Sequence, residues 1–217
     1  MRFQQFSSRD AMIGVLFAVA MWLTRSHEIV SVLSFPDVTL AACFLAGIFT
    51  RRWFTPALLL INAALIDYVA IVHGGVSDYC VTPAYIFLIP TYLTLWGCGR
   101  WVQLQPVGTW RSLLRSAIAV SIGVLGAFLI SNASFYAFSG YFREMPALTY
   151  TASVVRYLPG YFEGTLIYAG VVLGSVAAWR AARDLAASVA ASARGLLALP
   201  GSPGEKVDSL VVEMELA

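Results

Sequence analysis

Residues 112–138 read SLLRSAIAVSIGVLGAFLISNASFYAF, a run in which Arg115 is the only charged residue. A membrane-crossing helix needs about 20 apolar residues to span a hydrocarbon core of roughly 30 Å, so this run predicts a crossing. Hydrophobic residues make up 59% of the 217 residues and charged residues only 12%, which leaves too few polar side chains to cover a soluble globule. The sequence therefore predicts an all-α integral membrane protein.

Five further apolar runs accompany this one along the chain. They lie at about 11–24, 37–50, 53–73, 83–98 and 159–180. Short loops separate most of the runs, so the fold that we predict is a six-transmembrane-helix bundle. The second run is short for a full crossing, which indicates a tilted helix or one that begins earlier, within residues 29–35.

Basic residues gather at one end of these runs and acidic residues at the other. Arginine and lysine are held on the cytoplasmic side during insertion, so this asymmetry sets the orientation and predicts two cytoplasmic termini. The basic end is marked by Arg2, Arg9, Arg51, Arg52, Arg100, Arg111, Arg115, Arg180, Arg183, Arg194 and Lys206. The opposite, outer end is marked by Glu28, Asp37, Asp67, Asp78, Glu144 and Glu163, together with Arg25, Arg143 and Arg156. Because the basic residues are scattered along one membrane face, they form no nucleic-acid-binding patch.

The chain divides into a six-helix membrane domain, residues 1–199, and a C-terminal tail, residues 200–217. After Arg180 the sixth helix is expected to run on as an Ala-rich extension that lies along or just inside the membrane surface. The turn-forming residues Pro200–Gly204 end this extension. Ala18–Ala20 has the small-x-small pattern of a signal-peptide cleavage site, but apolar residues continue beyond it, so we expect the first helix to be retained.

The outer end of the third run carries the first candidate site residues. An acid within an apolar run is costly, so Asp67 either makes a structural hydrogen bond, for example to Tyr85, or lines a wet site. The Gly74–Gly75 pair that follows allows a tight turn with positive φ. That turn would bring Cys80 back over the helix ends, close to Asp67, Tyr79 and Tyr85.

Cys80 is the one cysteine of three that lies in an outer loop. Cys43 and Cys98 lie in other runs at different depths, which disfavours a disulfide and indicates apolar filler residues. Cys80 is either a thiol without a functional role or a metal ligand or nucleophile. A single thiolate is too few ligands for zinc, which takes three or four from the protein. One thiolate is enough for a metal that already carries its other ligands when it binds. Such a metal is found in a macrocycle, so Cys80 points to a metal macrocycle.

Haem is one such macrocycle, and the only histidines, His27 and His73, are its possible axial ligands. Haem with two histidine ligands needs them on facing helices at matched depth. Here His27 precedes a loop and His73 ends a helix, so interfacial or capping roles are favoured over haem binding.

Aromatic residues are dense near the outer ends of the fifth and sixth runs. An interfacial belt explains part of this density. They are interleaved with Ser131, Asn132, Ser134 and Ser139, a mixture that favours the wall of an amphipathic ligand site, and the loop 139–158 is long enough to be a lid. The aromatic residues are Phe135, Tyr136, Phe138, Tyr141, Phe142, Tyr150, Tyr157, Tyr161 and Phe162.

The segment DYVAIVHGGVSDYCVTPAY, residues 67–85, resembles the BtuM-type cobalamin-specific members of the S components of energy-coupling-factor (ECF) vitamin transporters. These are solitary six-helix substrate-binding proteins, and the resemblance covers roughly residues 10–180. It implies a multi-pass protein of the bacterial inner membrane that binds and takes up vitamin B12, with Cys80 as the axial ligand of cobalt. S components that dock a shared energising module resemble one another in an Ala-xxx-Ala motif on the first helix. Gly14 and Ala18 are the closest match to that motif here.

Cobalamin fits the metal-macrocycle argument, because its corrin ring supplies four equatorial nitrogens and leaves an axial position for one protein donor. We expect Cys80 to bind cobalt as the thiolate and to displace the nucleotide base, with Asp67 and Tyr85 taking part by hydrogen bonding and by accepting the thiol proton. These three residues are also the candidates for a slow decyanation of cyanocobalamin. The expected cobalamin-binding residues are Asp67, Tyr79, Cys80, Tyr85, Tyr136 and Tyr161.

Other functions stay open. The sequence has no Gly-rich loop followed by Lys-Ser or Lys-Thr, so an uptake protein would use a separate ECF energising module or rely on trapping of its substrate. Cobalamin and the lipid bilayer are therefore the expected partners, with or without that module. The alternatives are an S component for another vitamin and a membrane sensor or scaffold that signals through residues 181–199. An intramembrane protease is disfavoured, since paired aspartates and a Ser/His pair at one depth are missing from the sequence.

Overall fold

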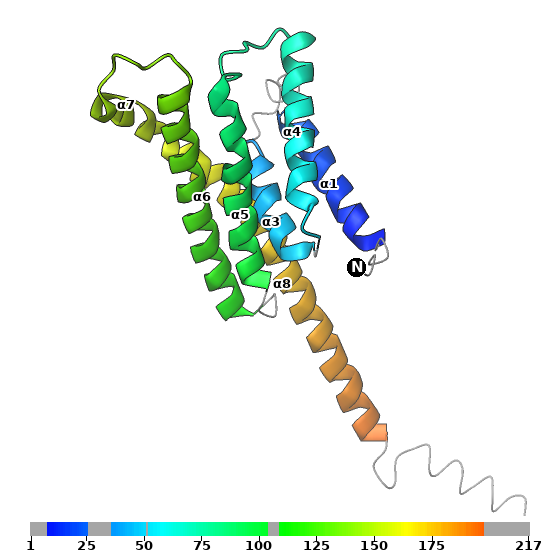
Figure 1. The fold of residues 1–217 in the computed structure, drawn as a ribbon. Coiled ribbons are helices and arrows are strands. Elements are labelled where there is room, and N and C mark those ends of the chain that lie inside the picture. Colours follow the sequence, from blue (N-terminus) through cyan, green and yellow to red (C-terminus); the bar gives the residue numbers. More distant parts are fainter. Residues whose placement is uncertain (1–7, 26–35, 51, 104–108, 198–217) are drawn as a thin grey trace, which may run out of the picture.

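The computed structural model describes residues 8–25, 36–50, 52–103 and 109–197, which fold into a bundle of helices (Figure 1). No β-strand occurs within these ranges, so the prediction of an all-α fold is confirmed for them. The elements are α1 (Ser8–Arg25), α3 (Thr39–Phe49), α4 (Thr55–Val72), η1 (Pro83–Phe87), α5 (Leu88–Gln103), α6 (Trp110–Phe138), α7 (Ala147–Val154), η2 (Val155–Tyr157) and α8 (Leu158–Leu197), where η denotes a 3-10 helix.

Three segments are long and apolar enough to cross a membrane, judged by length and composition. They are α4, α6 and the run from Ala147 to Arg194, which includes α7, η2 and most of α8. The apolar helix α3 has only 11 residues, in agreement with the short second run in the sequence. Three of the six predicted crossings thus have the length and composition that a bilayer requires.

Two boundaries differ from the sequence-based prediction. The fourth helix was expected from residue 83, but Pro83–Phe87 form η1 and α5 begins at Leu88. The hydroxyl of Thr82 accepts a hydrogen bond from the amide of Ala84 at 3.3 Å, and Pro83 favours the turn that follows. Pro90 lacks the N–H that would donate to the carbonyl of Ile86, so this turn stays a 3-10 helix separate from α5. The loop predicted at 139–158 contains the short helix α7.

Helix α3 is the centre of the bundle, and nearly all of its side chains are buried. It contacts α1, α4, α5, α6 and α8. Its backbone meets that of α5 at Gly47 and Gly99. A Cβ atom at Gly47 would overlap the carbonyl oxygen of Trp96, and one at Gly99 would overlap that of Phe44. Small residues of this kind let two helices approach closely where lipid provides no hydrophobic drive for association.

We therefore expect Gly47→Ala and Gly99→Ala to force α3 and α5 apart and destabilise the fold. Overpacking typically costs about 1–3 kcal/mol, and the clash with backbone rather than side chains places these variants at the upper end. Gly170→Ala is the matched control on α8, because nothing lies within 4 Å of an added Cβ there. Thermal unfolding in detergent should give lower midpoints for the first two variants only. Equal midpoints for Gly99→Ala and the control would contradict the close packing.

Helix α8 continues in one line beyond the bundle (Figure 1). The predicted helical extension after Arg180 is confirmed up to Leu197. Figure 1 shows it projecting past the ends of α5 and α6 without a bend, rather than turning along the end of the bundle. Its residues from 178 to 194 are exposed. The predicted tail, residues 200–217, lies outside the described residues.

Candidate functional site

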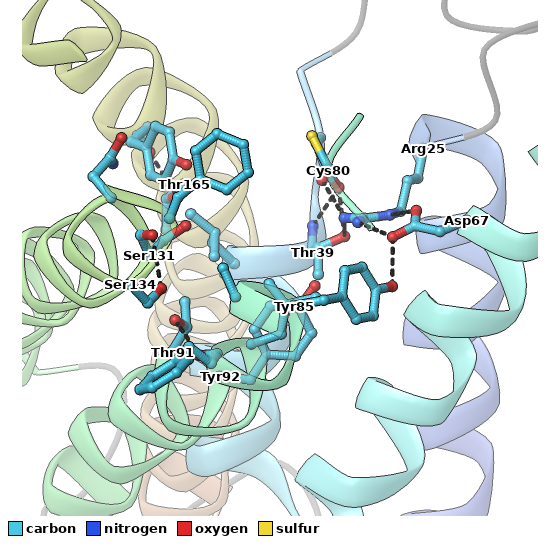
Figure 2. A pocket seen from close by; sticks show the side chains of 18 of the residues that line it. Arg25, Thr39, Asp67, Cys80, Tyr85, Thr91, Tyr92, Ser131, Ser134 and Thr165 are labelled. Carbon is cyan, nitrogen blue, oxygen red and sulfur yellow. Dashed lines mark hydrogen bonds and ion pairs between the residues drawn. The ribbon is translucent and has the colours of Figure 1, made fainter. Parts of the chain in front are cut away.

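A cavity of about 480 Å³ opens at the end of the bundle where α4 ends and α5 begins (Figure 2). Its walls come from the start of α3, the end of α4, η1, the start of α5, the end of α6 and the start of α8. A second cavity of about 380 Å³ shares Arg25, Asp37, Asp67, Cys80 and Tyr85 with the first. Ligand pockets commonly measure roughly 300–1,000 Å³, so each lobe has the size of a small-molecule site.

Cys80 reaches the cavity on the loop between α4 and η1. Gly75 turns the chain with a φ of 64°, a left-handed conformation that glycine adopts without strain. The amide of Val76 donates to the carbonyl oxygen of Ala70 at 3.2 Å, which folds the loop back over the end of α4. The predicted turn at Gly74–Gly75 is therefore confirmed. The Cys80 thiol is free and exposed, and it lines both cavities.

Asp67, near the end of α4, lines both cavities and is paired (Figure 2). Nε and Nη2 of Arg25 donate to its two carboxylate oxygens at 2.7 and 2.8 Å, the forked geometry that arginine forms with carboxylates. The hydroxyl of Tyr85 donates to Asp67 Oδ2 at 2.8 Å. The structural hydrogen bond and the cavity position, which the sequence offered as alternatives for Asp67, occur together.

Arg25, the last residue of α1, connects three parts of the bundle. Its Nη1 donates to Asp37 Oδ2 at 3.0 Å, and Asp37 Oδ1 accepts from the amide of Thr39 at 2.8 Å at the start of α3. The side chains of Arg25 and Asp67 are 21% and 23% exposed, so water screens this ion pair only in part. Sequence analysis placed Arg25 at the outer end and gave it no role. The sequence nevertheless carried a signal for Arg25. It is a basic residue at the acidic end, and the retention of arginine on the cytoplasmic side during insertion does not explain that position.

Tyr85 lies in η1, outside the helices that are long enough to cross a membrane. Burial, followed by the hydrogen bond to Asp67, raises the pKa of its hydroxyl well above the ordinary value for tyrosine. The hydroxyl therefore keeps its proton at neutral pH and donates it to the carboxylate. This hydrogen bond holds the Asp67 carboxylate in one orientation beside the Cys80 loop.

The facing wall is built from α6 and α8 and carries hydroxyl and amide groups. Ser134 donates to the carbonyl oxygen of Ser131 at 2.9 Å, and Thr165 donates to that of Tyr161 at 2.7 Å. These hydroxyl protons are thus used within the helices, while the oxygen lone pairs can still accept hydrogen bonds from a ligand. Figure 2 shows Ser131 and Thr165 on the opposite side of the cavity from Asp67 and Arg25. Tyr161, one of the predicted binding residues, lines this wall.

An aromatic cluster joins the Cys80 loop to the end of α6 and to the segment that leads to α7. Tyr79 stacks on Tyr141 with ring centroids 4.5 Å apart and planes 9° apart, and it meets Phe135 edge-on at 5.6 Å. The hydroxyl of Tyr136 donates to the carbonyl oxygen of Met145 at 2.8 Å. Tyr79 and Tyr136 thus contact the segment that leads to α7 and are not among the residues that line either cavity. Their direct role in ligand binding stays a prediction.

The other cysteines and histidines lie away from the cavity where the structure describes them. Cys43 is buried and Cys98 is half-buried, and all three cysteines are free. His73 forms the C-cap of α4, whereas His27 lies outside the described residues. Within the described ranges, no three histidine, cysteine or acidic side chains gather as a metal site.

Comparison with known proteins gives no family assignment. Neither a scan against protein-family models nor a search of curated proteins finds a match to the chain.

Proposed function

We propose that this protein binds cobalamin in the cavity around Cys80 and carries it across the bacterial inner membrane. The observation that supports this proposal is a free, accessible thiol that lines a cavity between an ion-paired acid and a wall of hydroxyl groups. A corrinoid presents a metal with one axial position to the thiol. Its rim of methyl and amide groups suits the mixture of Phe135, Tyr161, Ser131 and Asn132 on the facing wall.

Cys80 binds cobalt as the thiolate in this proposal, and the nucleotide base of cobalamin leaves the metal. A thiol loses its proton when it becomes a metal ligand, so a nearby acceptor helps the bond to form. Asp67 lines the same cavity, and Arg25 and Tyr85 donate hydrogen bonds to its carboxylate. It is therefore placed to receive the thiol proton, either directly or through water.

Cyanocobalamin would undergo a further slow step at this site. Electron donation from the thiolate weakens the cobalt–cyanide bond on the other face of the corrin. That bond breaks with its electron pair leaving on cyanide, so cobalt keeps its oxidation state and no reductant is needed.

Uptake requires a membrane topology, which we take to be six crossings with both termini in the cytoplasm. The lengths of α4, α6 and α8 support this, as does the concentration of arginine at the end of the bundle away from the cavity. The cavity then faces outward, where the vitamin arrives. An ECF energising module, or trapping of the vitamin inside the cell, supplies the direction of transport.

The vitamin assignment is tested by purifying the full chain in detergent from cells supplied with cobalamin. We expect the protein to retain the corrinoid, with a visible spectrum shifted from that of free cobalamin by thiolate ligation. Equilibrium binding of riboflavin, thiamine and biotin should be at least about 1,000-fold weaker, since the site would leave polar groups unpaired with them. Tight binding of one of these vitamins instead would identify an S component for that vitamin. Binding of none of the four would favour a sensor or scaffold.

A further inference from the structure

Tyr92 on α5 is a buried polar residue of the first cavity, the one of about 480 Å³ (Figure 2). It lies one helical turn beyond Leu88, further from the outer end of α5 than any other residue of that helix that lines the cavity. Tyr92 is only 3% exposed and belongs to the same buried core as Phe44 and Leu95. The core therefore holds the tyrosine ring at the inner end of the cavity.

The hydroxyl of Tyr92 makes no hydrogen bond to the residues that the structure describes. The neighbouring hydroxyl groups, in contrast, are used within the protein. Thr91 donates to the carbonyl oxygen of Phe87 at 2.7 Å, and Thr39 donates to the carboxylate of Asp37. Tyr92 thus differs from these two residues in having a proton that it can donate to a ligand.

The Tyr92 oxygen is accessible to solvent even though its ring is buried. Trp96 Nε1 is the one fully buried side-chain nitrogen or oxygen without a partner in the part of the chain that the structure describes, so the Tyr92 oxygen is not fully enclosed. Because Tyr92 is almost wholly buried and lines the cavity, its oxygen meets solvent through the cavity. A ligand that fills the cavity removes this solvent. It must then offer a hydrogen-bond acceptor or leave a buried donor unpaired.

The charged residues around the cavity favour a neutral acceptor over an anionic one. Arg25, Asp37 and Asp67 line the cavity, which gives these three side chains a net formal charge of −1. Arg25 already donates to both carboxylates, so its positive charge is compensated before a ligand enters. A ligand carboxylate would meet this excess of negative charge, and like charges held together at a binding site are unfavourable. A carbonyl oxygen accepts the same hydrogen bond without that cost.

We propose that the Tyr92 hydroxyl donates a hydrogen bond to a neutral carbonyl group of the ligand at the inner end of the cavity, where the surrounding charge disfavours a carboxylate. Under the function proposed above, on which this assignment rests, the carbonyl belongs to one of the side-chain amides of the corrin ring. Cys80 then binds the metal, whereas Tyr92 recognises the rim of the macrocycle. Tyr92 is therefore a residue that determines specificity.

Tyr92→Phe in the full chain tests the hydrogen bond through equilibrium binding of cobalamin in detergent. The variant should bind cobalamin about 5- to 100-fold more weakly than the wild-type protein, because the ligand carbonyl is left buried without a donor. Without ligand, its midpoint of thermal unfolding should equal that of the wild-type protein, since the hydroxyl has no partner to lose among the described residues. The Cys80-dependent visible spectrum of the bound vitamin should be retained.

Tyr168→Phe is the matched control for stability. The hydroxyl of Tyr168 donates to the carbonyl oxygen of Pro36 at 2.9 Å, and Tyr168 lines neither cavity. The same chemical change should therefore lower the midpoint of thermal unfolding without ligand at this position and not at Tyr92. A fall of the ligand-free midpoint in Tyr92→Phe as large as in Tyr168→Phe would contradict a hydroxyl reserved for the ligand.

The preference for a neutral group is tested with cobalamins in which one side-chain amide has been hydrolysed to a carboxylate. The wild-type protein should bind at least one of these derivatives about tenfold or more weakly than cobalamin. For that derivative the effects of the hydrolysed amide and of Tyr92→Phe should be non-additive, as expected for two groups in contact. Asp37→Asn should narrow the difference between amide and carboxylate, and asparagine can still accept the hydrogen bond from the amide of Thr39.

The outcomes separate this assignment from the vitamin proposal. Equal cobalamin affinities of Tyr92→Phe and the wild-type protein, with the Cys80-dependent spectrum intact, would overturn the role of Tyr92 and leave cobalamin binding standing. Additive losses for every hydrolysed derivative would likewise contradict a contact between Tyr92 and a corrin amide. A wild-type protein that binds no cobalamin would overturn both the vitamin proposal and the role of Tyr92.

Discussion

Cys80→Ala is expected to abolish the thiolate-dependent shift in the visible spectrum of bound cobalamin and to lower cobalamin affinity by more than about 100-fold. Loss of a neighbour that merely orients a metal ligand costs 10- to 100-fold, so loss of the ligand itself should cost more. Cys80 is exposed, and the substitution removes no core packing. The fold should therefore survive, which can be checked by an unchanged midpoint of thermal unfolding.

The matched control is Cys98→Ala, because Cys98 is half-buried on α5 and does not line the cavity. This variant should keep both the spectrum and the affinity. Cyanide release from cyanocobalamin should disappear with Cys80→Ala and persist with Cys98→Ala. A Cys80→Ala protein with the wild-type spectrum would refute cobalt ligation by this residue, even if cobalamin still bound.

Much of the fold follows from the sequence, because long apolar runs predict helices with little ambiguity. The boundary of the fourth helix did not follow. Thr82 and Pro83 start a 3-10 helix, and Pro90, which lacks the N–H that would donate to the carbonyl of Ile86, is the feature of residues 83–98 that separates this turn from α5; the apolar pattern alone does not reveal it. Local capping decides such boundaries, whereas hydrophobicity decides only that a helix exists.

The site was predictable in its location and less so in its contacts. Gly74–Gly75 indicated that Cys80 returns to the helix ends, and the acid at Asp67 indicated a hydrogen-bonded site there, both as observed. The forked pairing of Arg25 depends on how α1 packs against α4, 42 positions away in the chain. Tyr79 is adjacent to Cys80 in the sequence, but its ring stacks on Tyr141, in the segment that leads to α7. Sequence proximity located its backbone and could not give the direction of its side chain.

Arg25→Met is expected to destabilise the protein by about 2–3 kcal/mol, since removing one member of a buried ion pair costs 3–5 kcal/mol and partial exposure reduces that cost. The substitution leaves the half-buried carboxylate of Asp67 without its cation and with the hydrogen bond from Tyr85. Arg25→Lys should recover only part of the stability, because an ammonium group cannot reproduce the fork to both oxygens. Thermal or denaturant unfolding in one detergent would rank these variants. Arg156→Met is the control, since Arg156 is exposed and contacts Tyr157.

The double variant Arg25→Met with Asp67→Leu distinguishes two possible causes of the instability of Arg25→Met. One is the unpaired charge left on Asp67, and the other is the lost contact between the two side chains. If the single variant suffers because the Asp67 carboxylate is left without its cation, then replacing that carboxylate by an apolar side chain should restore stability, as it often does for buried ion pairs. The double variant should therefore unfold at a higher midpoint than Arg25→Met alone. A double variant less stable than either single one would show instead that Arg25 and Asp67 each contribute through contacts with other residues. Equal midpoints for Arg25→Met and the wild-type protein would mean that the ion pair between α1 and α4 adds nothing to the stability of the bundle.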